Sequence, residues 1–373
     1  DACDQFQKVC RISKAFAKLC DSDGFWRFVC EVNEFDREDR TTGYHEMHSV
    51  FVEKRWKKQF DKWCGLRFTD SSTLKKEVNE LCTQNPTGAG DVYRYGPITS
   101  WDVSKVQDMD GLFEGKFEFN QPIGSWNLAS LNTAQRMFKN AKAFNADLSN
   151  WKFPELEKMH EMFAHAQSFT GEGVANWTFP KATYMPGLFK SASSFNGDVS
   201  RWTFPQVKSM SSMFYGAAKF DSAVTYWKFP EATHLSQLFA EATSFTGKGV
   251  ENWTFPEATD VKAMFMEAKS FNGDVSKWTF PKAKSMNHMF YRATSFDSAV
   301  TGWEFPEATD LSSLFNGAVS FTGKGVTGWT FPKVEHTKSM FENAWSFNGD
   351  VSMWTFPKVE SMSSMFHDAA IFD

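Results

Sequence analysis

The stretch Ser270–Pro281 reads SFNGDVSKWTFP, and nearly the same phrase occurs at Ser194–Pro205 and at Ser346–Pro357. The copies begin at positions 194, 270 and 346, and so recur at a constant interval. Self-similarity of this kind is typical of repeat architectures, in which each unit is too small to bury its own apolar face and stacks on its neighbours. The phrase therefore predicts a stack of similar units rather than a conventional globular core.

A tryptophan marks every repeat, and the interval between two copies of the phrase holds three repeats. These tryptophans recur every 25 or 26 residues, as at positions 202, 227 and 253. We predict that they form one structural column: Trp101, Trp126, Trp151, Trp177, Trp202, Trp227, Trp253, Trp278, Trp303, Trp329 and Trp354. Two series of phenylalanines keep the same period, from Phe113 to Phe366 and from Phe119 to Phe372. Each repeat is called a coil below and is numbered from its tryptophan at position 0.

Within a coil, apolar residues stand at positions 0 and +2, as at Trp278 and Phe280, and this alternation predicts a short strand. In nine coils a proline follows and ends the strand, because it has no N–H to donate. Apolar residues then recur every three or four positions up to +18, which predicts a short helix or 3₁₀ turn. Position +19 is Asn, Thr or Asp and predicts a corner.

Composition limits the function classes. The 373 residues are 42% hydrophobic and 17% aromatic, which is ample material for a folded core. The formal net charge is −5, and neither half of the chain carries a basic stripe, so we expect no nucleic-acid partner. No run approaches the roughly 20 apolar residues that cross a bilayer, so we expect no transmembrane segment.

No motif predicts a metal or cofactor. The segment HEMFAH places His160 and His165 five positions apart, whereas two ligands on one helical face stand four apart. The GEGV and GKGV segments at Gly171, Gly247 and Gly323 fall in the longer coils, where glycine accommodates one extra residue in a tight corner. We therefore expect no cofactor, no metal and no catalytic residue, and predict that the protein is not an enzyme.

The segment SWDVSKVQDMDGLFEGKFEFNQPIGSW, Ser100–Trp126, resembles the repeat of the BspA-like leucine-rich repeat family, and the resemblance continues to Asp373. It implies a β-solenoid with leucine-rich-repeat character. From the period we expect about eleven coils, each with a short parallel strand and a short helix or 3₁₀ turn, in a right-handed solenoid that curves towards its strands because stacked strands are closer together than packed helices. Members are usually non-enzymatic and often lie on cell surfaces. Later coils depart from the family by replacing D-V-S after the tryptophan with TFP, KFP or EFP.

The sequence before the repeats predicts a small helical domain over residues 1–85, a linker over 86–97 and the solenoid over 98–373. One predicted helix carries SSTLKKEVNELC, with Ser72 as its N-cap.

The segment VCRISKAFAKLCDSDGFWRFVCE, Val9–Glu31, resembles the second half of an F-box, the adaptor-binding motif of ubiquitin-ligase receptors. The leading L-P-x-E half is absent. The resemblance implies core and adaptor-facing roles for Val9, Cys10, Phe16, Leu19, Trp26 and Phe28. The alternative is a helical cap that shields the first coil from water.

The cysteines are all found before the repeats begin: Cys3, Cys10, Cys20, Cys30, Cys64 and Cys82. Several lie in helical stretches, which favours reduced, buried thiols over disulfide bridges. A cytoplasmic location follows if the F-box resemblance holds, and a secreted or surface location follows if the cysteines are bridged.

Two functions remain open. The first is a scaffold whose repeated surface engages an extended or multivalent protein partner. The second is an F-box receptor that selects substrates with its solenoid. By the period, Asp373 falls in the middle of a repeat. We therefore expect further chain, a cap or a homotypic contact with a second copy to cover the open final coil.

Overall fold

The computed structural model describes residues 67–89 and 97–373, and the chain divides into two units. One unit holds residues 1–67 and 90–102, and the other holds 68–89 and 103–373. In the described part of the first unit, Arg67 forms a parallel bridge with Asp102, and its Nε lies 2.9 Å from an Asp102 carboxylate oxygen. The 3₁₀ helix η1, Ile98–Ser100, directly precedes the buried Trp101. The second unit contains helix α5 and the coils that follow.

Helix α5 spans Ser71–Gln84 and begins the second unit. Ser72 was expected to cap it, but Asp70 does so: its carboxylate accepts the Thr73 N–H at 2.8 Å and the Ser72 hydroxyl at 2.7 Å. These hydrogen bonds lower the pKa of Asp70. One apolar stripe of the helix is buried and consists of Leu74, Val78, Leu81 and Cys82.

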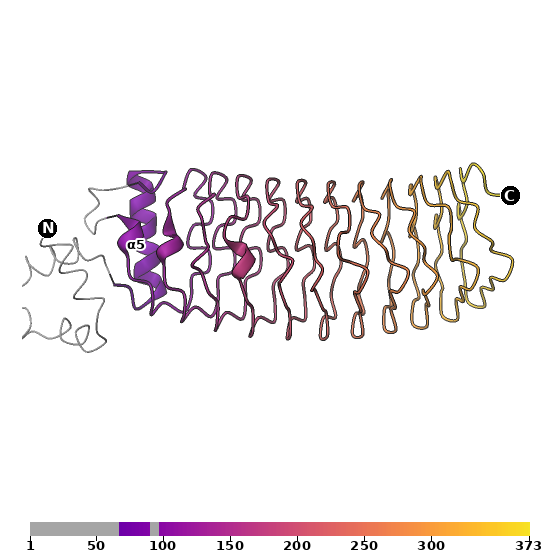
Figure 1. Cartoon of the computed structure of the whole chain (residues 1–373), viewed down its shortest axis with the longest axis horizontal. Helices are drawn as coiled ribbons and strands as arrows, with labels where there is room; N and C mark the ends of the chain where they lie inside the picture. Colours follow the sequence, from indigo (N-terminus) through magenta and orange to yellow (C-terminus); the bar gives the residue numbers. More distant parts are fainter. Residues whose placement is uncertain (1–66, 90–96) are drawn as a thin grey trace, which may run out of the picture. The chain divides into compact units, whose positions relative to one another are not determined.

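The segment after α5 closes onto the first coil of its unit. The Thr87 carbonyl accepts the Asn120 N–H at 3.3 Å and the Gln121 side-chain amide at 3.0 Å. Gly88 lies against the Phe119 ring so closely that a Cβ there would come within 2.6 Å of it. Lys75 on the helix reaches Asp108 of the same coil at 3.5 Å. The helix and this segment together cover the start of the stack (Figure 1).

The repeats follow one another as successive turns of the chain (Figure 1), each joined to the next by one parallel bridge at position +7. The bridged residues are Asp108, Thr133, Lys158, Tyr184, Ser209, His234, Asp260, Ser285, Asp310, His336 and Ser361. The strand was predicted at positions 0 to +2. That prediction was wrong in position and in length, because the parallel bridge between coils lies at +7 and involves one residue of each coil.

The predicted helix is replaced by consecutive turns. In the Trp202 coil the N–H groups of Met210, Ser212, Phe214 and Gly216 donate to carbonyls of the next coil at 2.8 to 3.0 Å. Between them, N–H groups close turns within the coil, such as Met213 to the Met210 carbonyl at 3.1 Å. Two residues per coil, at +10 and +14, have positive φ, a conformation that a right-handed helix cannot contain.

The 3₁₀ helices of the second unit lie outside the predicted segment. They are η2, Ile123–Ser125, and η3, Val174–Asn176, and each directly precedes a tryptophan. The predicted helix or 3₁₀ turn between +5 and +18 is therefore wrong. The apolar residues of this segment do recur every three or four positions, as in a helix. Here the spacing comes from overlapping turns, in which every second N–H donates to the neighbouring coil instead of to its own.

Aromatic columns fill the interior of the coils. Trp253 lies between Trp227 and Trp278, with ring centroids 6.0 and 5.6 Å away and nearly parallel planes. Each indole N–H from Trp151 to Trp354 donates to a carbonyl 28 or 29 residues earlier in the chain, just before the preceding tryptophan, as Trp278 does to Val250 at 2.9 Å. Phenylalanines at +2, +12 and +18 form three further columns, and almost all these rings are buried. Stacked pairs of this kind join Trp151 to Trp177 and Trp202, Trp227 to Trp253 and Trp278, and Trp303 to Trp329 and Trp354. A single structural column from Trp101 to Trp354 stays a prediction.

The hydrogen bonds at the +19 corner follow the three-coil repeat of the sequence. The Asn196 side-chain oxygen accepts the Asp221 N–H at 2.9 Å, and the Asp221 carboxylate accepts the Thr246 N–H at 2.9 Å. The Thr246 hydroxyl donates back to Asp221 at 2.6 Å, and the Thr246 backbone carbonyl accepts the Asn272 N–H at 3.2 Å. The order Asn, Asp, Thr then begins again at Asn272.

Glycines complete the predicted tight corner of the longer coils. Gly247 has φ +89°, and a Cβ there would lie 2.8 Å from the Gly273 Cα in the next coil. Gly171 and Gly323 occupy the same place against the coils that follow them.

The final coil is open. Trp354, Phe356 and Phe366 are half-buried, whereas their counterparts in inner coils are buried. Met353 and Ile371 expose 73% and 57% of their surface. The homotypic contact expected at this coil stays a prediction.

Candidate binding surfaces

Two of the surfaces that the coils expose are candidates for binding. The first, called the proline edge, consists of positions +1, +3 and +4. Trp and Phe at positions 0 and +2 point inward, so the residues between and after them are presented to solvent. Threonine occupies +1 in six coils and is exposed in all of them: Thr178, Thr203, Thr254, Thr279, Thr330 and Thr355. Because buried rings flank these exposed residues in the chain, packing of the rings in the core fixes the backbone of the proline edge.

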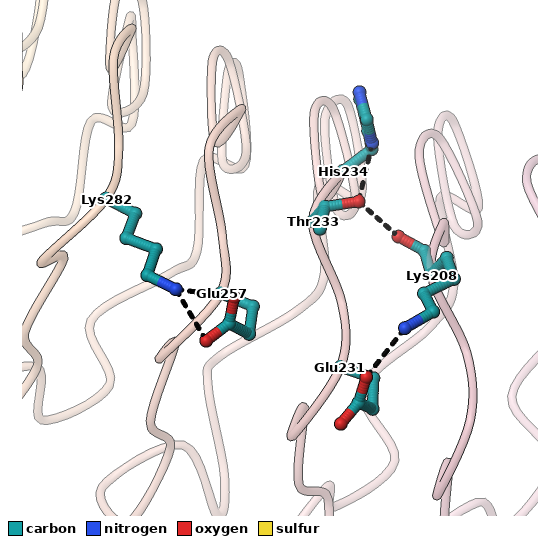
Figure 2. A network of polar contacts seen from close by, with 6 residues as sticks. All are labelled: Lys208, Glu231, Thr233, His234, Glu257 and Lys282. Atoms are coloured by element: carbon teal, nitrogen blue, oxygen red, sulfur yellow. Dashed lines mark hydrogen bonds and ion pairs between the residues drawn. The ribbon is translucent and has the colours of Figure 1, made fainter.

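Charged residues at +4 form ion pairs between coils along the proline edge. Lys282 contacts both oxygens of Glu257 at 2.7 and 2.6 Å. Glu231, on the coil before Glu257, is instead paired with Lys208 at 2.6 Å, so two glutamates of neighbouring coils are drawn to lysines on opposite sides (Figure 2). These side chains are about half exposed, and such pairs contribute little stability. Their charges are therefore available to a partner.

The second surface, called the turn face, consists of positions +7 to +16, where the bridges and turns lie. Its residues differ from coil to coil. Near the proline edge, the Thr233 hydroxyl lies 3.2 Å from the Lys208 carbonyl and 2.8 Å from His234 Nδ1 (Figure 2). Farther along, Tyr215 donates a short hydrogen bond to Glu241, which raises the Tyr215 pKa to about 12.

Positive charge gathers on the turn face of the Trp126, Trp151 and Trp177 coils. Lys139 lies 2.5 Å from Glu161, and His160 Nε2 lies 3.6 Å from the same carboxylate. Burial alone would raise the Glu161 pKa, but the Lys139 contact prevails and lowers it. Burial and then the charges of Lys190 and Lys139 lower the pKa of His165.

The histidines singled out from the sequence do not form a metal centre. In residues 67–89 and 97–373 the side chains of His, Cys, Asp and Glu nowhere form a group of three or more that could hold a metal ion. His160 instead lies beside Glu161, and its ring is 6.1 Å from that of Tyr184. The described part of the chain also contains no helix long and apolar enough to cross a membrane.

The adaptor-facing residues predicted from the F-box resemblance lie outside the described residues: Val9, Cys10, Phe16, Leu19, Trp26 and Phe28. The same holds for every cysteine except Cys82. Cys82 is a free, buried thiol whose pKa is raised by burial and lowered in part by Lys116. The basic group on the turn face was missed from the sequence. Its signal was the recurrence of lysine at +13, in Lys139 and Lys190, two coils apart.

Comparison with known proteins identifies one family. Its model, DUF285, is described as a Mycoplasma protein of unknown function, and it matches five overlapping segments, residues 46–177, 89–202, 157–253, 222–329 and 259–373. These segments together include every coil. No curated protein matches the chain.

Proposed function

The chain belongs to the DUF285 family, a repeat family of unknown function, and we propose that it is a non-enzymatic interaction scaffold for an extended or multivalent protein partner. The proline edge is the proposed contact surface. It offers exposed threonine at +1 in six coils, together with proline at +3 and, in most of the same coils, a charged residue at +4. An enzyme needs one asymmetric group of side chains, whereas this edge presents a repeated one.

The observation that carries the proposal is the exposure of the same residue types at the same positions in coil after coil, fixed by the buried columns behind them. Rigid presentation lowers the entropy that side chains lose on binding. A partner with its own repeats would make one weak contact per coil, and linked weak contacts raise overall avidity by about 10² to 10⁴.

Photo-crosslinking in cells of the source organism tests the proposal. A crosslinking amino acid is placed at Thr203 or Thr279, which are equivalent positions of the proline edge three coils apart. The control site is Lys219, which is exposed at +17. We expect the same protein to be captured from both edge positions and not from the control. Different adducts at Thr203 and Thr279, or none, would argue against a repeated contact surface.

The solenoid type is also part of the proposal. The parallel bridge at every coil and the regular offset between bridged residues support a β-solenoid, and its curved, right-handed form of the BspA-like leucine-rich repeat type is proposed from the sequence resemblance. An experimental structure that gave a left-handed path from coil to coil would contradict this assignment.

The second candidate is an F-box receptor, and it rests on the sequence resemblance of Val9–Glu31 alone. In this role residues 1–85 would bind a ligase adaptor, and the coils would bind the substrate. Co-purification with the adaptor tests it, with Leu19→Asp and Trp26→Ala expected to abolish the complex and Thr203→Lys expected to leave it intact. Adaptor binding that survives both N-terminal changes would count against the receptor role.

A further inference from the structure

The turn face carries a local positive charge that the net charge of the chain hides. Positions +7 to +16 of the Trp126, Trp151 and Trp177 coils contain five cationic residues and one acidic residue, Glu161, a net charge of 5 − 1 = +4. The cations, called the basic cluster, are Arg136, Lys139, Lys142, Lys158 and Lys190.

Neighbouring parts of the turn face lack this excess. The same positions in the preceding coil contain Asp108, Asp110, Glu114 and Lys116, a net charge of 1 − 3 = −2. In the three coils after the cluster, positions +7 to +16 contain two cationic and three acidic residues. In the next three coils they contain two of each. The basic cluster is therefore a single cationic site on an otherwise neutral or acidic surface, and the whole chain has a net charge of −5.

Several of the positive groups gather around a single carboxylate. The Lys139 ammonium and the His160 ring both face Glu161, and the charge of Lys190 acts on Glu161 as well as on His165. One carboxylate thus stands among several cationic groups. Arg136, Lys142 and Lys158 are exposed, and Lys139 and Lys190 are half-buried, so all five can meet a partner.

Aromatic rings border the cluster, but cations already occupy two of them. The Lys142 ammonium lies over the Phe117 ring, 5.2 Å from its centroid, and the Lys190 ammonium lies 5.5 Å from that of Tyr215. Single-stranded nucleic acids bind by stacking bases on free ring faces. Rings covered by lysine do not provide such platforms, whereas lysines held over rings remain able to pair with carboxylates.

From this arrangement we infer that the basic cluster binds an acidic segment of a protein partner. Charge complementarity selects the class of ligand: a run of Asp or Glu side chains finds its counter-charges over three adjacent coils and meets like charge on the preceding coil. The cluster occupies only these coils, so it would fix the register of a partner along the stack. This inference does not rest on the proline edge.

A fluorescence anisotropy titration tests the inference with a labelled Glu/Gly/Ser peptide, its Gln-substituted analogue and an oligothymidylate. The full chain carries either the triple change Arg136→Gln, Lys142→Gln, Lys158→Gln, or a matched control with equal loss of charge on the same face, Lys262→Gln, Lys269→Gln, Lys338→Gln. All six side chains are exposed, so folding should persist, and circular dichroism checks it.

We expect the acidic peptide to bind at low salt, to weaken as salt rises, and to lose about tenfold in affinity with the cluster variant but less than about twofold with the control. Glu161→Gln should tighten binding, because it removes the one opposing charge. Equal losses in the two triple variants, no binding of the peptide, or tighter binding of the oligothymidylate than of the peptide would each overturn the inference.

Discussion

Removing one ring from the tryptophan column should destabilise the coils on both sides of it. Trp253 is 1% exposed, lies between two tryptophans at 6.0 and 5.6 Å, and contacts Phe229 edge-on at 5.1 Å. Replacing a buried large aromatic residue by alanine costs about 3 to 5 kcal/mol, and each lost ring pair adds roughly 0.5 to 1.5 kcal/mol. We therefore predict a loss of about 5 kcal/mol for Trp253→Ala.

Trp354→Ala is the matched control. Its ring is half-buried and has a single tryptophan neighbour, Trp329, at 5.6 Å. We expect a loss of about 2 kcal/mol, since less apolar surface leaves water and only one interface between coils is affected.

Hydrogen exchange read by mass spectrometry is the suitable assay, because a linear array need not unfold in one step and local opening energies are then the meaningful quantity. The reporter amides are Phe239, which donates to Met264, and Phe265, which donates to Met289. Both should lose protection in Trp253→Ala and keep it in Trp354→Ala. Equal effects of the two changes, or a loss below about 1 kcal/mol at Trp253, would refute the column as the main source of stability.

Three further predictions concern the corners and the thiol. Burial alone would raise the pKa values of Asp221 and Asp297, but hydrogen bonds from lysine and threonine prevail and lower them; stability should therefore fall as the pH drops below the ordinary value of 3.8 and through the lowered values. Changing both residues to Asn should make the melting temperature depend less on pH over this range. An unchanged slope of melting temperature against pH would contradict the prediction. Gly171→Ala should lower the free energy of unfolding, measured by urea denaturation, by about 1 to 3 kcal/mol, because φ is +89° and the next coil leaves no room for a Cβ. The control Gly328→Ala, whose added Cβ meets open space, should stay within about 0.5 kcal/mol of wild type. Cys82 should react slowly with a thiol reagent at neutral pH, because it is buried and its pKa is raised; peptide mapping that found it modified as fast in the native as in the unfolded chain would contradict this.

The sequence predicts the period, the aromatic columns and the glycine corners, because each of these depends on residues that recur at fixed positions. It fails where the stack imposes a conformation that the local residues do not encode. Position +10 carries Arg136, Glu161 and Gln237 in different coils, and none of these residues signals positive φ, yet all adopt it. Hydrogen bonds to the next coil hold the turns and offset the local strain.

The corner at +19 shows a similar limit. Asn, Thr and Asp were predicted to turn the chain through their own backbone. In the structure the Asn and Asp oxygens accept N–H groups from the next coil, as Asn272 does from Asp297 at 2.9 Å. Longer-range pairing also places Lys248 beside Asp221, 2.6 Å apart although the two residues belong to different coils. Such a pair can be found in the sequence only by comparing charged residues about one coil period apart, as was done for the aromatic residues.

The central claim is that each repeat, from one tryptophan to the next, is one turn of a continuous stack. An experimental structure at side-chain resolution tests it most directly. We predict that the rings of Trp126 to Trp354 lie in one file, with neighbours spaced as Trp227 and Trp253 are, at 6.0 Å, and that backbone bridges join successive coils at position +7. Tryptophans that pointed in unrelated directions, or coils that paired out of this order, would contradict it.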